Sequence, residues 1–192
     1  MMDNPDYKKI IRELMGDYRY EHSVNVADEA VTLAELYGGD VDKAYTAGIL
    51  HDVTKELPND KQLQIINDGG IILDDVQKQA PKLWHAISGS VYIQTELDIT
   101  DSDIINAIRY HTTGRANMSL LEKIIYIADY TAKGRDYNGV EVMRELSRKS
   151  LEDAMIFSYQ FTINKLSSLE SAIHPDEIYG YNDIVLKRNR KE

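Results

Sequence analysis

His51-Asp52-Val53-Thr54-Lys55-Glu56-Leu57-Pro58 closes an apolar helical pattern that begins near Val41. We expect one helix from about Val41 through His51-Asp52, because Leu57-Pro58 forces the chain out of helical geometry. Adjacent helical residues diverge by about 100°, so both side chains of the His-Asp pair can reach an ion placed between their two directions. A carboxylate can also bind one ion through each of its oxygens. Asp52 is therefore a candidate bridge between two metal ions roughly 3.5 to 4 Å apart.

Helical periodicity extends from this stretch through almost the whole sequence, and strand-like alternation is confined to a short run at 71–73. The pattern predicts an all-α protein, a helical bundle of about eight to ten helices. The expected helices cover approximately residues 7–15, 21–37, 41–52, 59–68, 81–97, 100–111, 119–129, 140–146, 151–166 and a last segment from 175. Side-chain caps are expected at Asn59-Asp60, at Thr100 with Asp103, and at Ser119 with Glu122.

The length of 192 residues and the apolar content of 43% are sufficient for one domain with a sizeable core. We expect residues from about 18 to 146 to form the metal-binding core and helices within 150–192 to pack on it. The chain has no apolar stretch of the roughly 18 residues that a membrane span needs. Its N-terminal MMDNPDYKK also lacks the basic and apolar regions of a signal peptide. The sequence therefore predicts a cytoplasmic protein without a membrane partner.

Charge and cysteine content exclude several classes of partner and site. The net charge of −10 argues against a nucleic-acid partner, and the basic run at 187–191 is interpreted as a solvated helix end. Because the chain contains no cysteine, any metal must be bound by His, Asp or Glu. Thirteen tyrosines accompany only two phenylalanines. Tyrosine rings often line nucleotide pockets or subunit contacts, with helix packing as the alternative.

Six side chains with nitrogen or oxygen donors recur within the helical patterns: His22, His51, Asp52, His85, His111 and Asp129. Taken singly, such a His is usually a hydrogen-bonded core residue and such an Asp a helix cap. Together, six buried polar groups would each need a separate partner, whereas one pair of metal ions satisfies all of them. We expect His22, His51 and Asp129 to hold one ion. His85 and His111 would hold the second, with the bridging carboxylate between them.

The order His, His-Asp, His, His, Asp resembles the HD-domain superfamily of metal-dependent phosphohydrolases, and the flanking residues resemble its YqeK family. The segments that carry the resemblance are Arg19–Val24 (RYEHSV), His51–Pro58 (HDVTKELP), Tyr110–Arg115 (YHTTGR) and Met118–Tyr130 (MSLLEKIIYIADY). The resemblance covers about residues 18–146 and implies a single HD domain over 1–192 with two metal ions, reported as iron. It also implies symmetrical cleavage of diadenosine tetraphosphate to two ADP, and suggests a homodimer.

Two points qualify what the resemblance implies. The family's usual Glu-Pro-Gly-Arg is replaced here by Ala132-Lys133-Gly134-Arg135, which concerns loop geometry and substrate preference but no metal ligand. Imidazole and carboxylate ligands also suit manganese, zinc, cobalt and nickel, so the ligands alone do not identify the metal.

His174, which precedes Pro175, lies outside the ligand series and is expected at the surface or at a helix start.

With two divalent ions and two aspartates, the site would carry a charge of 4 − 2 = +2 and attract an anionic nucleotide to an acidic protein. The expected phosphate contacts are four cations and three hydroxyl groups: Arg19, Lys55, Arg115, Arg135, Ser88, Thr112 and Thr113. Surface salt bridges and capping or loop hydrogen bonds are their alternatives. A metal-bound hydroxide would attack an inner phosphorus, with Asp52, Lys55 and Arg135 as catalytic residues. Another nucleotide or alarmone phosphohydrolase and a non-catalytic nucleotide-sensing module are the alternative functions.

Overall fold

The computed structural model describes residues 6–190, and within that range it contains eleven α-helices, one short 3₁₀ helix and no strand. The elements are α1 (Tyr7–Leu14), α2 (Asp17–Tyr37), α3 (Val41–Leu50), α4 (Asn59–Asp68), α5 (Asp75–Gln79), η1 (Pro81–Leu83), α6 (Trp84–Thr95), α7 (Ser102–Arg109), α8 (Leu120–Thr131), α9 (Val140–Lys149), α10 (Leu151–Ser168) and α11 (Pro175–Asn189). The all-α prediction is confirmed. The short α5 was not expected. Residues 1–5 and 191–192, which include the end of the basic run at 187–191, lie outside the described residues.

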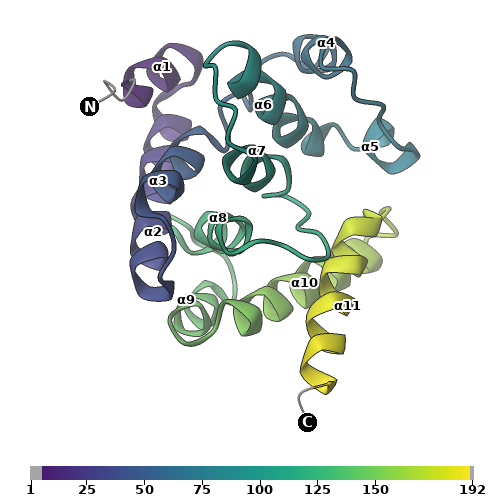
Figure 1. Ribbon diagram of the computed structural model, residues 1–192. Coiled ribbons are helices and arrows are strands. Elements are labelled where there is room, and N and C mark those ends of the chain that lie inside the picture. The colour runs from purple at the N-terminus through teal and green to yellow at the C-terminus, as the bar shows by residue number, and fades with distance from the viewer. Residues whose placement is uncertain (1–5, 191–192) are drawn as a thin grey trace.

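Helix α8 lies at the centre of the molecule, with α2, α3, α7, α9 and α10 packed around it (Figure 1). Its residues Ile124, Ile125, Ile127 and Ala128 are fully buried, because a helix that is apolar on all sides must be covered on all sides. One cluster of core residues extends from Tyr7 in α1 to Ile184 in α11. The core is thus continuous from the first helix to the last helix of the described part of the chain.

The His-Asp dipeptide does not continue the preceding helix as expected. Helix α3 ends at Leu50, and the chain from His51 to Glu56 forms tight turns closed by backbone bonds from Val53 to Leu50 and from Lys55 to Asp52. Bonds spanning three residues wind the backbone more tightly than an α-helix does. The chain therefore leaves the α-helix well before Pro58, and both ligands lie in the turns that follow Leu50.

The helix caps partly follow the sequence predictions. Ser119 and Glu122 form the expected capping box at the start of α8. Helix α7, however, is capped by Asp101, whose carboxylate accepts the backbone N–H groups of Asp103 and Ile104, so the prediction of Thr100 as the cap was wrong. Helix α4 begins directly after Pro58, which supplies no side-chain cap in place of the expected Asn59-Asp60.

His174 caps α11 through a bond from the backbone N–H of Asp176, as the helix-start prediction requires. Its side chain is buried rather than on the surface, because Nε2 lies 3.1 Å from the Gln77 amide and 3.0 Å from the Asp74 carboxylate. These contacts join α5 to the C-terminal helix. No helix within residues 6–190 has the length and apolar character needed to cross a membrane.

Tyr159 of α10 fills the space between two glycines that come from distant parts of the chain. Its ring is fully buried, and a Cβ atom added at Gly114 or at Gly180 would overlap its hydroxyl group. Gly114 also has a φ of +61°, which L side chains rarely adopt. The fold therefore requires glycine at both positions in order to bring α11 against the loop that follows His111.

Glu177 is a buried acid in the first turn of α11. Its Oε2 atom has no hydrogen-bond partner among residues 6–190, and burial raises the pKa of the carboxyl from 4.5 to about 7. The folded protein thus binds the carboxyl proton of Glu177 more tightly than the unfolded chain does. The contribution to stability is complete below about pH 4.5 and is lost as the pH rises through about 7.

Glu177→Gln is therefore expected to raise the free energy of unfolding at about pH 8 by on the order of 2 to 3 kcal/mol, because a neutral amide has no ionised form to bury. At about pH 5, where the carboxyl of the folded protein is protonated, the variant and the parent should unfold at similar temperatures. Thermal unfolding of both proteins at the two pH values measures this difference. A difference of the same size at both would contradict it.

Candidate metal centre

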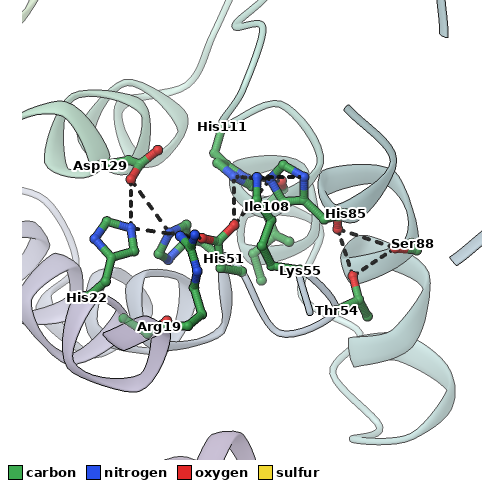
Figure 2. Close-up of polar contacts among 12 residues, drawn as sticks. Arg19, His22, His51, Thr54, Lys55, His85, Ser88, Ile108, His111 and Asp129 are labelled. Carbon is green, nitrogen blue, oxygen red and sulfur yellow. Dashed lines mark hydrogen bonds and ion pairs between the residues drawn. The ribbon is translucent and has the colours of Figure 1, made fainter. Parts of the chain in front are cut away.

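One group of donor atoms comes from α2, the turn after α3 and α8. Nε2 of His22 lies 3.0 Å from Oδ1 of Asp129, and Nε2 of His51 lies 3.7 Å from the same oxygen. Figure 2 shows the Asp129 carboxylate directed at these two imidazoles. Oδ2 of Asp52 faces the same group, at 3.4 Å from Nε2 of His51 and 3.9 Å from Nε2 of His22. These donors are close enough together to bind one ion.

A second group of donors faces the other oxygen of the same carboxylate. Nε2 of His85 in α6 lies 3.1 Å from Oδ1 of Asp52, and Nε2 of His111 lies 3.7 Å from it. The two imidazole nitrogens are 3.1 Å apart. Asp52 thus presents one oxygen to each group, which is the arrangement of a carboxylate that can bridge two ions. The structure brings all six sequence-predicted ligands together.

The hydrogen bonding of these side chains fits a metal centre. Nε2 of His51 and Oδ1 of Asp52 are buried, and neither has a hydrogen-bond partner within the described part of the chain. Nδ1 of His51 donates to the carbonyl of Gly48 at 2.7 Å, and Nδ1 of His111 donates to that of Ile108 at 2.8 Å. A carbonyl can only accept, so the proton is on Nδ1 and the lone pair of Nε2 faces the centre.

Metal binding requires ionised carboxylates and neutral imidazoles, and the pKa shifts of Asp52, His85 and His22 favour these states. Burial alone would lower the pKa of His51 as well, but the neighbouring Asp52 carboxylate raises it. Burial alone would raise the pKa of Asp52, but the imidazoles of His51, His111 and His85 beside its carboxylate hold it well below the ordinary value. Burial lowers the pKa of His85 to about 4, so this imidazole is neutral near pH 7. Burial likewise lowers the pKa of His22, despite the opposing bond to Asp129.

Three of the predicted cations surround the centre. Nη1 of Arg19 donates to Oδ2 of Asp52 at 2.6 Å, and Nζ of Lys55 lies 3.1 Å from both ring nitrogens of His85 (Figure 2). Arg135 donates to the carboxylate and the backbone oxygen of Asp129. Each cation therefore already lies beside a candidate ligand, where it can also meet an anion that binds there.

Three other predicted substrate contacts form bonds to other parts of the fold. Ser88 is fully buried, and its hydroxyl lies 2.7 Å from that of Thr54, which donates to the backbone oxygen of His85. Thr113 is buried and donates to the backbone oxygen of Gly114. Arg115 forms a two-point ion pair with Glu122 at 2.6 and 3.1 Å. These three side chains thus form hydrogen bonds or a salt bridge within the protein, which are the alternatives to phosphate contact given by the sequence.

The remaining hydroxyl, Thr112, lines a cavity of about 370 Å³ next to the centre. The cavity also includes side chains that the sequence reasoning missed, namely Tyr130, Tyr137, Phe161 and Lys165. The sequence also did not indicate the role of Arg144. This side chain supports the loop after α8 by donating to the backbone oxygens of Thr131, Ala132 and Arg135. Tyr130 ends one of the segments that carry the family resemblance, but no local motif marks Tyr137, Phe161, Lys165 or Arg144, because their positions depend on contacts between distant segments.

Comparisons with known proteins match most of the chain. The HD domain family model matches residues 19–134. A symmetrical bis(5'-nucleosyl)-tetraphosphatase from Halalkalibacterium halodurans is 37% identical over 180 residues, covering 94% of this chain and 96% of that protein. The enzyme of the same name from Bacillus subtilis is 37% identical over 187 residues, covering 96% and 98%.

A solved structure gives the same result for the fold. The crystal structure of a protein described as a predicted HD superfamily hydrolase involved in NAD metabolism, from Clostridium acetobutylicum, superposes with a TM-score of 0.93. The two sequences are 37% identical, and the match covers 97% of this chain and 99% of that one. The similarity therefore extends over the whole bundle, including the helices that follow the matched family segment.

Proposed function

This chain belongs to the HD domain family, and we propose that it is a metal-dependent hydrolase that cleaves diadenosine tetraphosphate symmetrically to two ADP. The observation that carries the proposal is the carboxylate of Asp52, which shares its two oxygens between two groups of ligands. The reaction class is supported by relatives named symmetrical bis(5'-nucleosyl)-tetraphosphatase that are 37% identical over more than nine tenths of the chain.

The donor set fits two divalent ions, with His22, His51 and Asp129 on one side and His85 and His111 on the other. Iron is the metal that the family resemblance suggests, and imidazole with carboxylate is a suitable ligand set for it. When bound, such ions would lower the pKa of a coordinated water and polarise the phosphoryl oxygens. This chemistry accounts for the hydrolysis of an inner phosphoanhydride bond.

Three cationic side chains of the protein would bind the polyphosphate next to the candidate metal ligands. Arg19 and Arg135 each contact a carboxylate of the centre, so a phosphate oxygen that approaches the ligands also meets a guanidinium group. Lys55 lies on the opposite side, against His85. The overall reaction forms a bond from water oxygen to an inner phosphorus and breaks the central anhydride bond. Lys55 and Arg135 would neutralise the charge that gathers on the departing ADP.

We further propose that the chain forms one HD domain, acts in the cytoplasm on a nucleotide rather than a nucleic acid, and pairs with a second copy of itself. The net charge of −10 supports a small-molecule substrate over a polyanionic one. Once two ions are bound by the two aspartates and the imidazoles, the centre would carry a local positive charge although the protein as a whole is acidic.

Product analysis tests the proposed reaction. Incubation with diadenosine tetraphosphate and iron or manganese should yield two molecules of ADP for each substrate consumed, as measured by anion-exchange chromatography. AMP with ATP as products would indicate attack at an outer phosphorus and a different hydrolase. The absence of any product with all five candidate metals would favour the nucleotide-sensing alternative.

The metal content of protein purified without chelators is expected to be close to two ions per chain, because the ligands divide into two groups around one carboxylate. Removing the ions should lower the unfolding temperature as well as the activity, since a ligand that binds only the folded state stabilises it. Elemental analysis with thermal unfolding before and after chelation measures both effects. One ion per chain at full activity would argue against a dinuclear centre.

A further inference from the structure

Polar and aromatic side chains both line the cavity beside the metal centre. His111, Asp129 and Arg135 are among the polar residues, and the aromatic residues are Tyr130, Tyr137 and Phe161. Its volume of about 370 Å³ lies within the range of roughly 300 to 1,000 Å³ typical of small-molecule sites. A molecule in this cavity would therefore touch aromatic surface and candidate metal ligands at once.

We propose that this cavity is the subsite for one adenosine of the substrate, with Phe161 and Tyr137 as the rings that contact the base and Lys165 as a phosphate contact. The proposal rests on the proposed function and adds the residues that select the nucleoside. A purine is flat and apolar on its faces, so aromatic side chains bind it without needing a sequence motif. The sequence contains no glycine-rich phosphate loop that would bind the nucleotide otherwise.

The aromatic wall is held in place by contacts across three segments. The rings of Tyr137 and Phe161 lie 5.8 Å apart, and those of Tyr130 and Tyr137 lie 6.4 Å apart. Tyr137 donates its hydroxyl to the backbone oxygen of Tyr130, and the Tyr130 hydroxyl lies 3.3 Å from that of Thr162. The wall is thus formed before a ligand arrives, which limits the ordering that binding requires.

Lys165 gives the cavity a positive charge that the fold does not use. It lies four residues after Phe161 in α10 and so projects from the same side of the helix. Its side chain is exposed, and its ammonium group makes no ion pair or hydrogen bond within residues 6–190. The polyphosphate of a substrate held at the centre would pass Arg135 on its way into the cavity, where this ammonium group can meet the phosphate next to the ribose.

These residues lie outside the part of the chain that matches the family model, which ends at 134. The metal ligands all fall within the matched segment, whereas Tyr137, Phe161 and Lys165 follow it. The common segment therefore supplies the candidate metal centre and Tyr130, and the segment from 135 onward supplies Tyr137, Phe161 and Lys165.

The first test replaces the aromatic ring. Phe161→Ala is expected to weaken binding of ADP about tenfold, in line with the usual effect of removing one stacking ring, and to raise KM for diadenosine tetraphosphate with little change in kcat. Inhibition by inorganic pyrophosphate, which has no base, should be unchanged. Tyr179→Ala, which removes an exposed ring of α11, is the matched control and should behave as the parent.

The second test removes the charge. Lys165→Met is expected to weaken ADP binding about three- to tenfold but to leave binding of adenosine unchanged, and Lys149→Met in α9 is its control. Equilibrium dialysis with labelled ADP separates this proposal from the reaction itself, because it reports binding even if the substrate is not hydrolysed. Unchanged ADP binding in a folded Phe161→Ala protein, or equal losses for ADP and pyrophosphate, would overturn the assignment.

Discussion

Asp52→Asn is expected to lower kcat/KM for diadenosine tetraphosphate by about a thousandfold or more, while the helices remain folded. Loss of a single electrostatic stabiliser of a transition state already costs roughly 10²- to 10³-fold in rate. This substitution affects both groups of ligands, because Oδ2 faces His51 at 3.4 Å and Oδ1 faces His85 at 3.1 Å. An amide keeps only one ligand oxygen, so the metal content should fall from about two ions per chain to about one.

The measurements are steady-state kinetics, elemental analysis and circular dichroism on the same preparations. Asp75→Asn is a suitable control, because that side chain is 95% exposed and its ion pair with Lys78 is on the surface of α5. The control should retain activity and metal. A folded Asp52→Asn protein with two ions and the activity of the parent would rule out the bridging role.

Gly114→Ala is expected to destabilise the protein by about 3 kcal/mol or more, which combines a strained backbone with overpacking of a fixed core. The added methyl would overlap the hydroxyl of Tyr159, whose ring is fully buried, and alanine does not favour a φ of +61°. Gly70→Ala separates the two effects, since Gly70 has a φ of +68° but no atom within 4 Å of the added Cβ. It should lose only about 1 kcal/mol.

Urea unfolding of the three proteins measures these differences, and metal content provides a second measurement. Gly114 is three residues from His111, so a backbone shift that relieves the overlap should also displace that imidazole and reduce metal binding. Equal losses of stability at Gly70 and Gly114 would show that the Tyr159 contact is not limiting.

The elements of this fold that the sequence predicts are those with a long, uniform pattern. Helix α8 is an example, because its apolar run and its Ser119 and Glu122 cap each specify the same helix. Helix α5 was missed, since five residues are too few for periodicity to show. The end of α3 was placed too late, at Asp52, because the turns that follow Leu50 depend on contacts of the folded state rather than on a breaker residue.

The same distinction applies to the site. The six donors were predictable because each stands in a helical pattern where a polar group needs a partner. The direction of a side chain was less predictable, as Ser88 illustrates: it lies one turn from His85, yet its hydroxyl is directed at Thr54. The position of Phe161 and Lys165 in the cavity wall could not be predicted, because it depends on how α10 packs against α8 and α9.

The bonds from His51 to Gly48 and from His111 to Ile108 have a consequence for how the centre is loaded. Both acceptors belong to the main chain, so each ring is oriented before an ion arrives, and capture needs neither a ring flip nor a tautomer change. Any residue at 108 would offer the same acceptor. Position 48 would also offer the same acceptor with any residue. A Cβ there would lie 2.8 Å from the backbone of Ala27, however, so the close contact between α3 and α2 is what excludes larger residues.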